Sequence, residues 1–149
     1  MISFVIPGNP IPTGRPRVTA RGTFLPKASR EYQRAVAAHA KRAMALRRDE
    51  FPLAGPVAVR VAFVRGNRRA CDLDNLGKSI LDGLTQAGAW GDDAQVVELH
   101  VTKRVDAAAP RAEVHVYPHP EAEYGSAWED AHEPIPDPSP GKDLSAGGA

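Results

Sequence analysis

The sequence predicts one α+β domain, α/β-like in its alternation, with a mixed β-sheet packed by two helices in the order β-α-β-α-β-β. Runs rich in β-branched residues mark four strands, and two stretches with helical spacing separate them. A chain of 149 residues is long enough for one domain with a real core but not for two comfortable ones. We expect this domain to occupy residues 1–117.

The first strand is predicted at residues 2–6, a short apolar run. A Gly/Pro-rich segment follows, and within it residues 17–20 and 23–25 flank a turn, which predicts a small hairpin. A helix is then predicted, with Ser29 as its N-cap. Its weakly apolar face consists of Tyr32, Ala35, Val36, His39, Ala40 and Ala43.

A second strand is predicted at residues 57–64, where apolar residues on both sides indicate that both faces are partly covered. The second helix is predicted to run from Asp74 or Asn75 to Gln86, because either residue is a good N-cap. Its buried stripe consists of Leu76, Ile80, Leu81 and Leu84.

The last two strands are predicted at residues 95–103 and 113–117. The inward-facing residues are predicted to be Val97, Leu99, Val101, Val114 and Val116. From residue 118 the composition changes to Pro, Gly, Ser, Ala and acidic residues, which predicts a disordered acidic tail over residues 118–149.

The net charge of +1 conceals an asymmetry. Residues 1–117 carry 18 Lys and Arg against 11 Asp and Glu, whereas residues 118–149 carry one Lys and seven acidic residues. A basic body of this size favours anionic partners, with nucleic acid first among them. The tail either serves solubility alone or folds back on the basic face as a weak mimic of nucleic acid.

The first apolar stretch is too short for a signal sequence or a membrane span, so we expect no membrane association. The single cysteine, Cys71, has no partner for an internal disulfide, which fits a reducing cytoplasm. No Cys/His spacing indicates structural zinc.

Four carboxylates and one lysine surround the second predicted helix. Asp72 and Asp74 are one residue apart at the end of an extended segment, so their side chains are expected on one side. Lys78 lies about one turn into the helix and reaches back toward its N-terminus. Asp92 and Asp93 precede the next strand, and if the flanking strands are neighbours, Asp93 is expected to return near the first two acids.

Carboxylates are the ligands of hard cations such as Mg²⁺, which usually takes one or two of them plus substrate phosphate. In a basic protein, such a site indicates metal-assisted attack on a polyanion, with the lysine stabilising charge or assisting proton transfer. Each residue also has a plainer interpretation: Asp74 as an N-cap, Asp92 and Asp93 as turn residues, and Lys78 with Asp82 as a surface pair. Their joint arrangement favours chemistry.

These residues resemble the RusA-type Holliday junction resolvases. The similar central segments are Asp72-Leu73-Asp74-Asn75-Leu76, Lys78, Asp82-Gly83-Leu84 and Gly91-Asp92-Asp93-Ala94-Gln95-Val96. Upstream, Arg15-Pro16-Arg17, Gly22 and Tyr32 are similar in kind and order to the family's basic N-terminal region. The resemblance spans about residues 1–117.

The resemblance implies a homodimeric endodeoxyribonuclease that depends on Mg²⁺, with Mn²⁺ as a substitute, and cuts four-way junctions by paired nicks in DNA recombination and repair. By position, Asp72, Asp74 and Asp93 are the essential metal-binding acids, Lys78 is the catalytic lysine, and Asp92 is a neighbouring metal ligand. The basic candidates for contacts to the DNA backbone are Arg15, Arg17, Arg21, Lys27, Arg65, Arg68 and Arg69.

Three alternatives stay open at this stage. The first is the same chemistry on other branched DNA such as flaps or forks. The second takes the Asp-x-Asp pattern as a nucleotide-sugar site, although no Gly-rich nucleotide loop accompanies it. The third is a DNA-structure-binding protein without catalysis, whose acids only cap helices. The sequence leaves open the cleavage preference, the number of metals and a cellular or phage origin.

Overall fold

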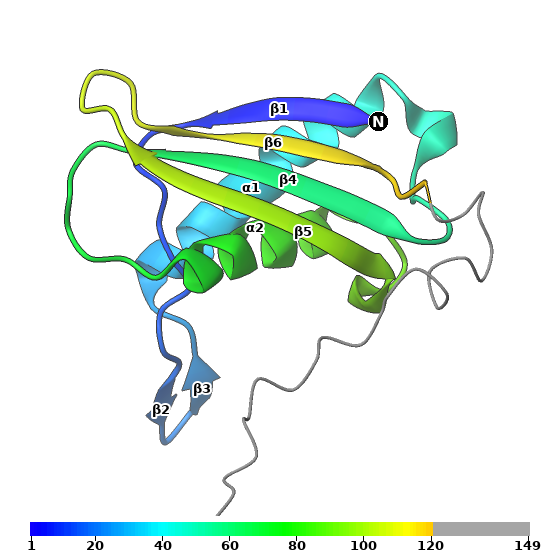
Figure 1. The fold of residues 1–149 in the computed structure, drawn as a ribbon. Coiled ribbons are helices and arrows are strands. Elements are labelled where there is room, and N and C mark those ends of the chain that lie inside the picture. The colour runs from blue at the N-terminus through cyan, green and yellow to red at the C-terminus, as the bar shows by residue number, and fades with distance from the viewer. Residues whose placement is uncertain (121–149) are drawn as a thin grey trace, which may run out of the picture.

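The computed structural model describes residues 1–120, and the prediction for the tail lies almost wholly outside them. These residues form a four-stranded sheet with two long helices, and a small two-stranded hairpin extends from this body (Figure 1). The elements are β1 Ile2–Pro7, β2 Arg17–Thr19, β3 Gly22–Phe24, α1 Lys27–Ala45, η1 Arg48–Glu50, β4 Val57–Arg65, α2 Leu73–Ala87, η2 Asp93–Gln95, β5 Val96–Val105 and β6 Arg111–Pro118.

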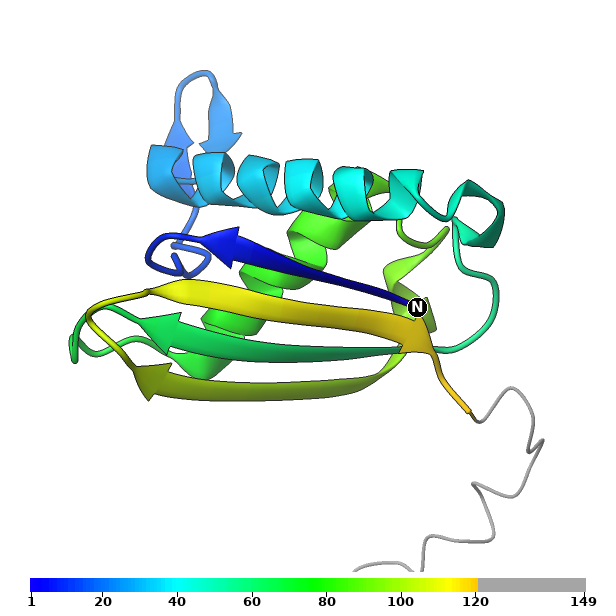
Figure 2. The same ribbon diagram turned by 90° about the horizontal axis from the view of Figure 1, so that it is seen from above.

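The sheet is mixed, and its strand order is β1-β6-β4-β5. β6 runs antiparallel to both β1 and β4, whereas β4 and β5 are parallel and are joined through α2. Both long helices lie on the same face of the sheet (Figure 2). The α+β fold and its order of main elements are therefore confirmed, and so is the predicted hairpin.

The core lies between the sheet and the two helices. On β4, Val57, Val59, Val61 and Phe63 are buried there, because alternate side chains of a strand share one face. On the other face Arg60 is exposed, although the small neighbour Ala58 is fully buried. Partial cover on both faces of this strand was expected.

The start of α1 differs from the prediction. Pro26 occupies the N-cap position and Ser29 lies inside the first turn, where it is buried. The Ser29 hydroxyl donates to the carbonyl of Pro12 at 3.1 Å and accepts the Gly14 N–H at 3.0 Å. The N-cap assignment was wrong because this serine ties down the N-terminal segment instead of the helix end.

Helix α2 begins one or two residues earlier than expected. Asp72 occupies its N-cap position, with no side-chain cap bond, and the predicted caps Asp74 and Asn75 belong to the first turn. The helix ends at Ala87, and its C-cap residue, Gly88, has a φ of +79°. Glycine adopts this left-handed conformation without steric cost and so stops the helix cleanly.

Strand β5 also corrects the prediction. It starts at Val96, and a register shift opposite the Val57/Ala58 step leaves Val97 without a partner on β4. Val97 is 51% and Leu99 43% exposed, because β5 is an edge strand that the helices cover incompletely. By contrast, Val114 and Val116 on β6 are fully buried as expected.

Within residues 1–120, no helix is both long and apolar enough to cross a lipid bilayer.

The two helices meet at Gly83. A methyl group at this position would lie 2.5 Å from Cβ of Val36 and 3.0 Å from the carbonyl oxygen of Gln33. Only a residue without a side chain allows this approach, so Gly83 sets the spacing between α1 and α2.

Gly83→Ala is therefore expected to destabilise the protein by about 1–3 kcal/mol, because overpacking outweighs the gain in helix propensity. Urea unfolding measures the change. Gly77→Ala on the same helix is the matched control, because its new methyl would lie 3.6 Å from Val101 in ordinary contact. The control should be stabilising, and equal effects at the two positions would contradict the close-packing argument.

Candidate functional site

A groove of about 430 Å³ runs between α2 and β5. Four of its lining residues have chemically active side chains: Asp74, Lys78, Asp82 and Asp93. Its apolar wall comes from Leu81, Val96 and Leu99, and Thr85 completes it. The groove therefore contains three carboxylates and a lysine beside an apolar wall.

The acids lie at different ends of this groove. Asp74 is in the first turn of α2, which has 15 residues, and Asp93 follows its far end. From Asp74 to Thr85 the helix rises about 16 Å, at 1.5 Å per residue. β4 and β5 are neighbours as expected, but in a parallel pair the end of one strand and the start of the next lie at opposite edges.

The structure thus places Asp74 and Asp93 in one groove without bringing them side by side. Asp72, just before the helix, is not among the groove-lining residues. Within residues 1–120, no three His, Cys, Asp or Glu side chains are grouped closely enough to hold a metal ion.

The first turn of α2 holds the Asp72 and Asp74 carboxylates at the positive end of the helix dipole. One Asp74 oxygen accepts the Asn75 N–H at 2.8 Å, and the Asn75 amide donates to Asp72 at 3.4 Å. Both acids are exposed. Two open carboxylates that flank Leu73 fit the donor set of a hard cation, which completes its shell with water and phosphate.

Asp92 has a structural task. Its carboxylate accepts the Ala94 N–H at 2.8 Å, while the Gln95 side chain accepts the Asp92 N–H at 2.9 Å. This reciprocal capping box closes the short helix η2. It fixes the next residue, Asp93, at the start of η2, just before β5.

Lys78 stands between the groove and a second cavity. That cavity has a volume of about 460 Å³ and contains Arg15 as well as Lys78 and Asp82. The segment that carries Arg15 is fixed to α2, because the Thr13 N–H donates to the Asn75 carbonyl at 3.0 Å and the Ser79 hydroxyl donates to Ile11 at 2.8 Å. The sequence did not indicate that this distant arginine would come so close to Lys78.

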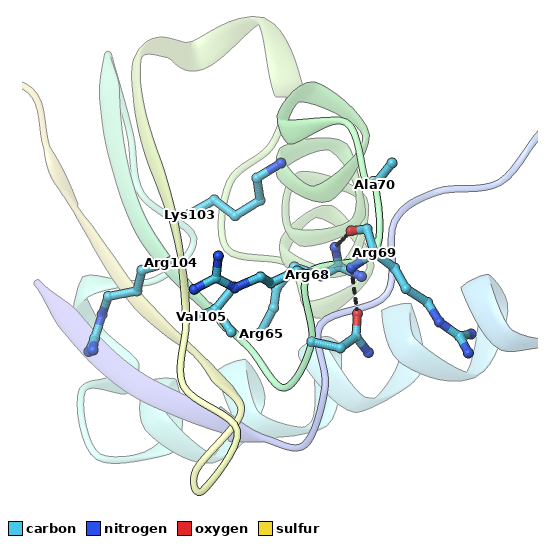
Figure 3. A pocket seen from close by; sticks show the side chains of 8 residues that line it. Arg65, Arg68, Arg69, Ala70, Lys103, Arg104 and Val105 are labelled. Atoms are coloured by element: carbon cyan, nitrogen blue, oxygen red, sulfur yellow. Dashed lines mark hydrogen bonds between the residues drawn. The ribbon is translucent and has the colours of Figure 1, made fainter.

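A third cavity is basic and lies beside the loop from β4 to α2 (Figure 3). Its volume is about 430 Å³, and its lining includes Arg65, Arg68, Arg69, Lys103 and Arg104. The first three were expected from the sequence as DNA contacts. Lys103 and Arg104 come from β5, and only the parallel pairing of β4 with β5 brings them here.

Two of these cations hold the loop. Arg65 is only 7% exposed, and its guanidinium donates to the carbonyl of Arg69. The ammonium of Lys103 donates to the carbonyl of Cys71 at 2.6 Å, directly before Asp72. Arg68 and Arg69 are exposed and carry charge outward.

The other predicted DNA contacts are distributed more widely. Arg17 and Arg21 lie on the exposed hairpin, which projects from the body (Figure 1). Lys27 begins α1 and forms an exposed pair with Glu31 at 3.7 Å. Basic residues therefore lie on two sides of the start of α2. One group belongs to the segment of Arg15 and the hairpin, and the other to the loop from β4 to α2.

Sequence reasoning gave Asp82 no role beyond a surface pair with Lys78, although Asp82 lies in a segment that carries the family resemblance. It did not single out Gln33, Lys103 or Arg104. The i,i+4 spacing of Lys78 and Asp82 was the one local signal. The remaining contacts depend on pairing between distant segments, which no local spacing reveals.

The comparison with known families supplies the assignment. The family model described as endodeoxyribonuclease RusA matches residues 7–117. This chain belongs to the RusA endodeoxyribonuclease family. The match covers the whole described body except its first strand residues and its last few residues, and it includes every sequence-predicted site residue.

Named relatives agree with that assignment. The chain is 42% identical over 90 residues to a protein named crossover junction endodeoxyribonuclease RusA from Escherichia coli K12. It is 53% identical over 51 residues to the protein of that name from Enterobacteria phage 82, over 34% of this chain and 42% of the phage protein. The K12 match covers 60% of this chain and 66% of the relative.

Lys103→Met should loosen the loop over residues 66–72, because it removes the hydrogen bond to Cys71. We expect faster backbone hydrogen exchange in that loop, with a nearly unchanged melting temperature because Lys103 is exposed. Mass spectrometry of exchanged peptides measures this.

Lys41→Met, the same change at an exposed position on α1, is the matched control and should leave the loop unaffected. Equal exchange in the wild-type and Lys103→Met loops would show that the bond does not order this segment.

Proposed function

We propose that this protein is a metal-dependent, structure-selective endodeoxyribonuclease that resolves four-way DNA junctions by paired phosphodiester hydrolysis in recombination and repair. The observation that carries the proposal is the start of α2 in a member of this family. There Asp72 and Asp74 are exposed, and Asp74 lines one groove with Lys78. Lys78 also borders the cavity that contains Arg15. A cytoplasmic location remains a prediction from the single cysteine.

The acids are suited to hold a hard divalent cation, for which we propose Mg²⁺, with Mn²⁺ as a substitute. Asp72 and Asp74 would hold it, with Asp93 as a further ligand. Once bound, such an ion neutralises phosphate charge and lowers the pKa of a coordinated water. Lys78 would stabilise charge on the scissile phosphate or move a proton there, since its ammonium lines the same groove.

The basic surfaces suit the DNA backbone. Arg15 faces the cavity beside Lys78, and Arg68 and Arg69 line the cavity beside the loop. The Arg17 and Arg21 hairpin would extend the contact. Such contacts position the phosphates without reading sequence, and they make affinity fall with rising salt.

A homodimer would resolve the separation of the acids. Because Asp74 and Asp93 lie at opposite ends of one groove, two copies related by a two-fold axis can place Asp93 of one copy beside Asp74 of its partner. The exposed apolar residues Val97 and Leu99 beside the groove favour such a contact. Two equivalent sites also match the near two-fold symmetry of a junction.

Asp74→Asn should lower junction cleavage by on the order of 10³-fold while junction binding in Ca²⁺ survives, because the fold does not need this charge. The assay compares a synthetic four-way junction, its matched duplex and a flap, each with Mg²⁺ or EDTA. Asp49→Asn, the same change at an exposed position on η1, is the control.

Symmetric nicking of the junction alone, dependent on Mg²⁺, is the expected wild-type result. Equal digestion of all three substrates would remove junction selectivity. Full activity in Asp74→Asn would leave this acid as a structural residue. A wild-type protein that binds the junction but does not cut it would instead be a DNA-binding protein without catalysis.

Mixed dimers test the shared site. A dimer of one Asp74→Asn copy and one Asp93→Asn copy keeps one site with both acids intact if each site takes one acid from each subunit. We therefore expect nicking by co-expressed, doubly tagged mixed dimers, although each variant alone is inactive. If both acids of a site came from the same copy, the mixed dimer would be inactive as well.

A further inference from the structure

A buried glutamine connects α1 to the groove. Gln33 is only 3% exposed, and its side-chain amide donates to one oxygen of Asp82 at 3.0 Å. Its own carbonyl oxygen accepts from the Gln86 amide at 3.1 Å. Both hydrogen-bonding ends of this side chain are therefore used, which fixes its orientation inside the helix–helix interface.

The other oxygen of Asp82 faces Lys78. It accepts from the lysine ammonium at 3.4 Å, and Asp82 lines both cavities that Lys78 separates. One carboxylate thus bridges a buried amide on one side and the ammonium of the groove on the other.

The packing of the helices makes this bridge possible. Gly83 is the neighbour of Asp82 and lets α1 approach closely. A Cβ added at Gly83 would lie only 3.0 Å from the backbone carbonyl oxygen of Gln33. A larger residue at 83 would push the Gln33 side chain away from Asp82. The same contact that closes the core therefore brings the amide within reach.

We propose that Asp82 and Gln33 are positioning residues for Lys78, a role that rests on the proposed nuclease function. An exposed ion pair alone contributes little, because a lysine stem is flexible and water competes for its charge. Here the carboxylate is anchored from the buried side, so it holds the ammonium in one part of the groove. In this role Asp82 acts through Lys78, since one of its oxygens faces the buried amide and the other faces the ammonium.

Asp82→Asn and Gln33→Met test the role. Both should lower kcat for junction cleavage, by about 10- to 100-fold and about 10-fold, since a misplaced catalytic group costs up to about 10²-fold. Junction affinity in Ca²⁺ and Mn²⁺ affinity by calorimetry should stay at the wild-type level. These two binding measurements separate positioning of Lys78 from a metal-binding or DNA-binding role.

A double-mutant cycle gives the sharpest readout. In a Lys78→Met background, Asp82→Asn should have no further effect on cleavage, because its only route to the reaction is gone. In the Asp82→Asn background, Gln33→Met should likewise add nothing. Independent of activity, the side-chain amide NMR signals of Gln33 should shift and lose protection from hydrogen exchange in Asp82→Asn.

Tyr32→Phe is the matched control on α1. Tyr32 is buried beside Gln33 in the chain, and its hydroxyl has no hydrogen-bond partner among residues 1–120. Removing this hydroxyl should leave cleavage at the wild-type rate. The Tyr32→Phe variant thus tests whether any change in the buried part of α1, and not only the loss of the Gln33 amide, disturbs the site.

The outcomes separate the two proposals. Suppose that the wild-type protein cuts the junction. An unchanged kcat in Asp82→Asn, or additive losses in the Lys78→Met cycle, would then overturn the positioning role alone. Weaker Mn²⁺ binding in Asp82→Asn would assign Asp82 to the metal instead. A wild-type protein that cuts no junction would overturn the proposed function and, with it, this inference.

Discussion

Strands β4 and β5 run parallel, and a parallel pair must be joined by a connection that returns to the edge where the first strand began. Here α2 makes that return. The loop before α2, with Asp72, therefore lies at one edge of the sheet, and the turn after it, with Asp93, lies at the other. This constraint places the acids at the ends of a groove instead of in one cluster.

The same connection determines where charge gathers. Because β5 lies parallel to β4, Lys103 pairs with Phe63 and lines a cavity with the residues of the loop that follows β4. Its ammonium and the buried Arg65 guanidinium are each bonded to a loop carbonyl. Part of the basic character seen in the sequence is thus used to hold the backbone of this loop.

The second constraint is the close contact between the helices. Gly83 has no side chain, so Val36 packs against the backbone of α2 and Gln33 reaches Asp82. Core packing and site geometry therefore depend on one position. Asp82 is the neighbour of Gly83 in the chain, so a side chain at position 83 would disturb the contact between Asp82 and Gln33.

The sequence alone predicted the secondary-structure elements and the reactive side chains. The strands, the two helices, the hairpin and the carboxylates around Lys78 follow from periodicity, turn residues and residue type, because these depend on near neighbours. Ser29 shows the limit of this reasoning: it has the right chemistry for a cap, but its hydroxyl is bonded to a segment 17 residues away.

Only the tertiary structure decided which side chains meet. Val97 reads as a core residue, yet it lies at a register shift on an exposed edge strand. Gln33 and Lys103 carry no local signal, yet each makes a contact across a long stretch of chain. By itself the sequence determined the elements and the reactive groups, since these are short-range properties. Their distances depended on strand order and helix spacing, which arise when the whole core packs at once.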